Sequence, residues 1–216
     1  MQMTSDTTIP APTARAPIWL RIGFWGCIVI AVAVVIRRLF ALAAVRPASS
    51  RFEGLDTAFA NHTALTLAHI LPALVFVILA PIVVFGKTPR FAWAEQLLFP
   101  IGAIVGLTAY AMSLYSIGGW LERSAVLFFD TLFLFSLFRA YRYRQSGDLP
   151  RERRWLLLSI GILLGIATTR PVMGVFFATS RLTHLAPSQF FGMAFWVGFS
   201  INTIIVGLWL RARRRA

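Results

Sequence analysis

Six apolar runs, each close to twenty residues long, constrain this sequence more than any other feature. An α-helix of about 20 apolar residues crosses the hydrocarbon core of a bilayer, and it satisfies its own backbone hydrogen bonds where no water is present. The sequence therefore predicts an all-α, polytopic membrane bundle with six transmembrane helices in a single domain over 18–211. The predicted spans are 18–38, 64–86, 96–119, 120–141, 155–177 and 187–210.

The composition supports a lipid bilayer as the main partner of the chain. Hydrophobic residues make up 58% of the sequence and charged residues only 13%, whereas soluble domains are roughly half apolar and one quarter charged. The net charge of +13 comes from basic residues that cluster between the apolar runs. They are not interleaved with aromatic residues as in a nucleic-acid groove, so we expect no nucleic-acid partner.

The distribution of arginine and lysine predicts how the chain is oriented. Most basic residues outside the runs fall on the side of the membrane that holds both chain ends, above all in the segment 139–154. Cytoplasmic loops carry this excess. We therefore expect a multi-pass protein of the bacterial inner (cytoplasmic) membrane with both termini inside the cell. Residues 1–17 are expected to form a disordered cytoplasmic tail, and residues 212–216 a basic one.

Three ionisable residues, His69, Asp130 and Arg170, lie well inside predicted spans. Such residues are costly in hydrocarbon and usually face a partner or a cavity. Counted at about 1.5 Å per helical residue, all three fall in the half of the bilayer away from the termini, which is the periplasmic half. Asp130 and Arg170 differ in depth by a distance that an arginine side chain can reach, so the sequence predicts an ion pair between them.

Other polar side chains fall at a similar depth and predict a pocket between helices. His62, Thr66 and His69 share one helical face, and hydroxyl groups follow on two other spans. The predicted ligand-binding residues are His69, Asp130, Arg170, Tyr115 and Thr169. The alternative is a structural Asp–Arg clasp in which a neighbouring hydroxyl satisfies His69.

Two glycine pairs predict close helix packing. Gly102 and Gly106 lie four residues apart in the third run, and Gly161 and Gly165 in the fifth. This small-residue spacing lets helix backbones approach one another in membranes.

The sequence disfavours a bound cofactor or metal. A membrane b-type haem needs histidines that project into the bundle, and of three histidines only His69 lies well inside a span. His62, His184, Glu53 and Asp56 have no diagnostic metal-ligand spacing. The chain contains no phosphate-binding loop, HExxH or G-x-S-x-G motif, so we identify no catalytic residue and expect a non-enzymatic protein.

The sequence contains the stretch LAHILPALVFVILAPIVVF, which begins at Leu67, and the stretches RERRWLLLS and TTRPVMGVFF. These stretches resemble the bacterial multi-pass membrane family known as domain of unknown function 2306. The resemblance covers roughly residues 50–210. It aligns His69 with the first family histidine, Trp155 with a tryptophan, Ser159 with a serine and Arg170 with a closing arginine. The second and third family histidines are absent. If those histidines hold a redox cofactor in the family, this chain lacks most of the ligands.

The sequence thus leads to three hypotheses. The first is a membrane protein whose periplasmic-side pocket binds a small or lipid-like ligand, as a transport component or as an accessory partner in a membrane complex. The second is a membrane redox protein that binds haem or quinone. The third is a purely structural bundle.

Overall fold

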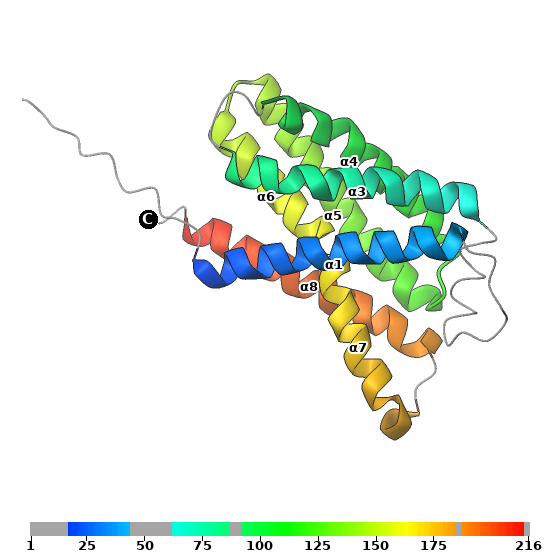
Figure 1. Cartoon of the computed structure of the whole chain (residues 1–216). Helices are drawn as coiled ribbons and strands as arrows, with labels where there is room; N and C mark the ends of the chain where they lie inside the picture. The colour runs from blue at the N-terminus through cyan, green and yellow to red at the C-terminus, as the bar shows by residue number, and fades with distance from the viewer. Residues whose placement is uncertain (1–16, 44–61, 87–91, 185–186, 214–216) are drawn as a thin grey trace, which may run out of the picture.

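The computed structural model describes residues 17–43, 62–86, 92–184 and 187–213, and these residues are almost all helical (Figure 1). Residues 1–16 of the predicted N-terminal tail and the last three residues of the basic tail lie outside the described residues. The helices in chain order are α1 (Ile18–Ala43), α3 (Thr63–Phe85), α4 (Ala92–Ser113), α5 (Gly119–Gln145), α6 (Leu149–Leu163), α7 (Gly165–Thr183) and α8 (Pro187–Ala212).

Six spans of this structure are long and apolar enough to cross a membrane, with α6 and α7 together supplying the fifth. This confirms the predicted all-α, six-span membrane class. The start of α1 and the end of α8 lie at the same end of the molecule (Figure 1), as an even number of spans requires. The third span is shorter than expected, because α4 ends at Ser113 and a turn precedes α5. Gly119 adopts a φ of 62° at this turn, a conformation that glycine adopts without strain.

The predicted continuous helix over 155–177 is interrupted at Leu164. Leu164 caps the end of α6 with a ψ of −9°, and α7 starts at Gly165. Beyond this break α7 leaves the direction of α6 and runs out of the bundle beside α8 (Figure 1). Hydropathy could not reveal the break, because the residues on both sides of it are equally apolar.

Both glycine pairs lie at close helix contacts, as predicted. A Cβ atom on Gly102 would lie 2.7 Å from Leu137 of α5, and one on Gly106 would lie 2.5 Å from Leu134. In the broken span, Gly161 and Gly165 face Val206 and Phe199 of α8, and a Cβ atom on either would come within 2.6 Å. Glycine therefore brings α4 against α5, and the α6–α7 break against α8.

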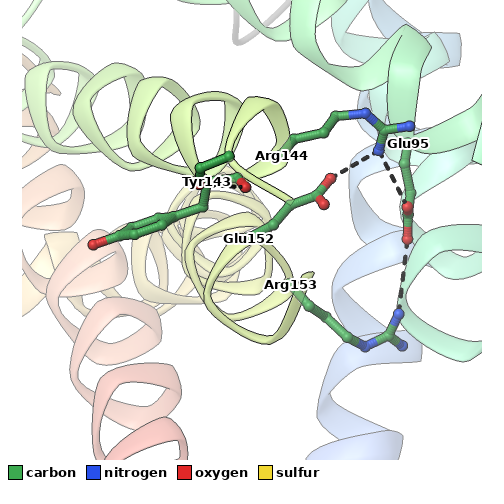
Figure 2. A network of polar contacts seen from close by, with 6 residues as sticks. Glu95, Tyr143, Arg144, Glu152 and Arg153 are labelled. Carbon is green, nitrogen blue, oxygen red and sulfur yellow. Dashed lines mark hydrogen bonds and ion pairs between the residues drawn. The ribbon is translucent and has the colours of Figure 1, made fainter. Parts of the chain in front are cut away.

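A charge network joins four helices at the end of the bundle that holds the chain ends (Figure 2). Arg144 of α5 lies 2.8 Å from the Glu152 carboxylate of α6 and 3.5 Å from Glu95 of α4. Arg153 lies 3.8 Å from Glu95 and donates a 3.0 Å hydrogen bond to the carbonyl of Val84 at the end of α3. In the sequence, these arginines predicted only the orientation of the chain in the membrane. In the structure they also connect the ends of neighbouring helices.

Candidate functional site

A cavity of about 250 Å³ opens between the helices in the half of the molecule away from this network. It is far larger than one water molecule needs. Its walls come from α1, α3, α4, α5, the α6–α7 break and α8, and they are mainly apolar. The polar and charged residues that line it are Arg38, Thr66, His69, Ser113, Tyr115, Ser116, Glu122, Asp130 and Arg170.

Four of the five predicted site residues line this cavity: His69, Asp130, Arg170 and Tyr115. Residues from four separate parts of the chain, which were predicted to lie at a similar depth in the bilayer, therefore line one cavity. Thr169 does not line the cavity. Its side chain is fully buried, its hydroxyl donates a 3.0 Å hydrogen bond to the carbonyl of Gly165, and its backbone packs against α8.

His69 is held by a hydroxyl group on the neighbouring helix. Its Nδ1 atom lies 3.0 Å from Oγ1 of Thr108 on α4. That hydroxyl has one proton, and carbonyl oxygens of Ile104 and Val105 lie 2.7 and 3.0 Å from it. When the threonine proton goes to a carbonyl, Nδ1 of His69 is the donor toward Thr108. In the neutral ring, Nε2 is then the acceptor.

The predicted ion pair between Asp130 and Arg170 is not formed. Oδ2 of Asp130 is buried without a hydrogen-bond partner, and so is Nε of Arg170. The physical reason is the packing of the two helices that carry them. Helix α7 packs along α8 and α1, while α5 packs on α4, α6 and α8. Depth along the membrane normal brought the two residues to one cavity, but depth alone does not determine which way each helix faces.

Arg170 has a different set of charged neighbours from the expected one. Glu122 attracts it electrostatically, and Arg37 and Arg38 repel it. Glu122 lies in the first turn of α5, where its Oε2 accepts a 2.5 Å hydrogen bond from the backbone N–H of Gly118. Sequence reasoning missed Glu122 and Arg38 as lining residues because both fall near span ends, where charged residues usually reach solvent.

The other polar residues of the predicted pocket separate into three groups. Thr66 and Ser113 line the cavity, and His62 stacks on Tyr115 at its edge with ring centroids 3.7 Å apart. Tyr110 bonds the Thr131 hydroxyl at 2.6 Å on an exposed face. Thr168 donates to Asn202 of α8 at 2.8 Å and so ties the α6–α7 break to α8.

Neither haem nor a metal ion finds a ligand set in the described part of the chain. His69 is the histidine that lines the cavity, while His184 is exposed after the end of α7. Among the described residues, no group of three or more histidine, cysteine, aspartate or glutamate side chains could hold a metal ion. Glu53 and Asp56 lie outside those residues.

Comparisons with protein-family models, with curated proteins and with solved structures found no match to this chain. The fold and the cavity themselves define the class: a multi-pass α-helical membrane protein with a cavity between its helices that is mainly apolar and carries a few charged residues.

Proposed function

We propose that the protein binds a small or lipid-like ligand in the cavity, as a ligand-binding, transport or accessory component of its membrane. Ligand sites are typically concave and mostly apolar, with a few convergent polar groups that orient the ligand. The cavity has this composition. Apolar side chains from all the helices around it form most of its wall, and His69, Glu122, Asp130 and Arg170 are among the few polar residues that line it.

One observation carries the proposal. Arg170 lines the cavity. Its Nε atom is buried without a hydrogen-bond partner, and its NH1 atom contacts the Met173 sulfur at 4.0 Å. A buried charge that lacks a close ion-pair partner is destabilising. Glu122 attracts Arg170 electrostatically, but a purely structural bundle would gain from a close ion pair, and Asp130, which lines the cavity from α5, does not form one with Arg170.

We further propose that the protein lies in the inner membrane with both termini in the cytoplasm, and that it is related to domain of unknown function 2306. A redox role has less support, because one cavity histidine does not supply the two axial ligands of a b-type haem. Quinone binding stays open as one form of lipid-like ligand.

The proposal can be tested by filling the cavity. Ala73 lines it on α3, whereas Ala68 on the same helix is exposed. Ala73→Phe places a ring in the cavity, and Ala68→Phe adds the same group to the outer surface. We expect mass spectrometry of the protein purified in mild detergent to find a retained small molecule in the wild type and in Ala68→Phe, and not in Ala73→Phe. Equal retention in both variants would place the ligand elsewhere.

A further inference from the structure

We infer that the cavity selects an anionic amphiphile, whose acid group binds Arg170 and whose hydrocarbon chain lies along the apolar wall. This inference rests on the proposed function and adds the chemical class of the ligand.

Arg170 lines the cavity as a cation. Among the described residues, Glu122 attracts it, whereas Arg37 and Arg38 repel it. Its Nε atom is buried without an acceptor. A planar guanidinium binds carboxylate or phosphate oxygens through two parallel hydrogen bonds. An acid group of a ligand in the cavity would therefore meet a guanidinium that no described carboxylate binds closely.

Among the described residues, the two acidic residues of the cavity do not form a close ion pair with Arg170. Glu122 attracts Arg170 electrostatically, while its Oε2 atom accepts the N–H of Gly118 at 2.5 Å. Asp130 lines the cavity from α5 with Oδ2 buried and unbonded.

The rest of the wall is mainly apolar. Val77 of α3, Phe129 and Phe133 of α5, Ile162 of α6 and Phe199 of α8 line the cavity. Inorganic phosphate or another free anion would leave this apolar surface uncovered, whereas an alkyl chain would pack against it. The walls therefore favour a carboxylate or phosphate that carries an alkyl chain.

The test uses the full chain in nanodiscs of neutral phosphatidylcholine and a fatty acid that bears a photoreactive diazirine on its chain. After irradiation, peptide mass spectrometry locates the labelled residues. Four competitors are then compared at equal concentration: decyl phosphate, decanol, decyltrimethylammonium and inorganic phosphate. Empty nanodiscs correct the first three for partitioning into lipid.

We expect the label on cavity residues of α3 and α5, and we expect decyl phosphate to remove it at an about tenfold lower concentration than decanol. Decyltrimethylammonium and inorganic phosphate should leave it in place. Equal competition by decanol and decyl phosphate would overturn the anionic class while leaving the proposed function intact. Displacement by inorganic phosphate alone would overturn the amphiphile. Absence of any label in the cavity would count against the proposed function itself.

A variant pair assigns the selectivity to one side chain. Arg170→Gln should bring decyl phosphate and decanol to similar potency. Arg123 is the matched control, because it is an arginine of α5 that packs over the Trp120 ring, 5.8 Å from the centroid, and does not line the cavity. Arg123→Gln should keep the tenfold preference, and its loss there would contradict a role for Arg170. Since the competitor series on the wild type needs no substitution, the inference stays testable if Arg170→Gln does not fold.

Discussion

Nδ1 of His69 on α3 lies 3.0 Å from the hydroxyl oxygen of Thr108 on α4. This bond crosses between two helices that pack along their length. The structural alternative predicted from the sequence had two parts. The first part, a neighbouring hydroxyl that bonds His69, is present. The second part, an Asp130–Arg170 clasp, is not formed, so that clasp does not explain the charged residues of the cavity.

Thr108→Val should destabilise the protein by about 0.5–2 kcal/mol, because a buried Nδ1–H loses its acceptor while the side-chain shape is kept. Unfolding in mixed micelles with increasing sodium dodecyl sulfate measures the change. The control is Thr203→Val on α8. The Thr203 hydroxyl is buried without a partner, so its removal should be neutral or stabilising. A cost as large as that of Thr108→Val would contradict this assignment.

Gly198→Ala should disrupt the contact between α7 and α8. A Cβ atom at this position would lie 2.5 Å from the Thr169 hydroxyl oxygen and 2.6 Å from its backbone nitrogen, so one of the helices must move. Overpacking of this kind typically costs about 1–3 kcal/mol. Gly207→Ala on the same helix meets nothing within 4 Å and should change stability by less than about 0.5 kcal/mol. The same unfolding assay compares them, and equal effects would be inconsistent with the described packing.

Arg144→Gln should be more harmful than the loss of an ordinary surface charge. It removes the guanidinium that lies between Glu95 and Glu152, and the Glu152 side chain is only 4% exposed. Removing one partner of a buried pair costs about 3–5 kcal/mol, and less where water reaches the group, so we expect about 1–3 kcal/mol. Arg151→Gln is the control, since Arg151 pairs with Asp148 and is 63% exposed. Its expected cost is below about 1 kcal/mol.

The sequence predicted the spans and most of the cavity residues for one physical reason. Helical rise converts position in a span into depth, so His69, Asp130 and Arg170 could be assigned to one level of the bilayer before any contact was known. The six apolar runs likewise followed from bilayer thickness.

Sequence reasoning failed where the answer depends on helix direction and rotation. The break at Leu164 has no hydropathy signal, and hydropathy does not show that α7 packs on α8 and α1 rather than on α5, which carries Asp130. Glu122 and Arg38 lie near span ends. At such positions a sequence does not distinguish a charged side chain that extends to solvent from one that lines a cavity. Arg144 was interpreted by its charge alone, and only the packing of α4, α5 and α6 shows that it also joins carboxylates.

The visible spectrum of the purified protein should be featureless, both oxidised and after dithionite reduction. His69 is the single histidine among the cavity-lining residues, and a b-type haem held by two histidines needs a second one across the bundle. A Soret band that His69→Ala abolishes would favour the redox hypothesis over a simple binding site. The corresponding control is His184→Ala, because His184 is remote in sequence and exposed, and its substitution should leave the spectrum unchanged.

The most direct test of a ligand site at Arg170 is a density map of the wild-type protein in a lipid nanodisc, at a resolution that separates side chains. We predict non-protein density within hydrogen-bonding distance of the Arg170 guanidinium that continues between α3 and α5, and its absence in Ala73→Phe. A wild-type map in which Arg170 turns onto the carboxylate of Asp130 and the cavity holds only water would contradict the proposed ligand site.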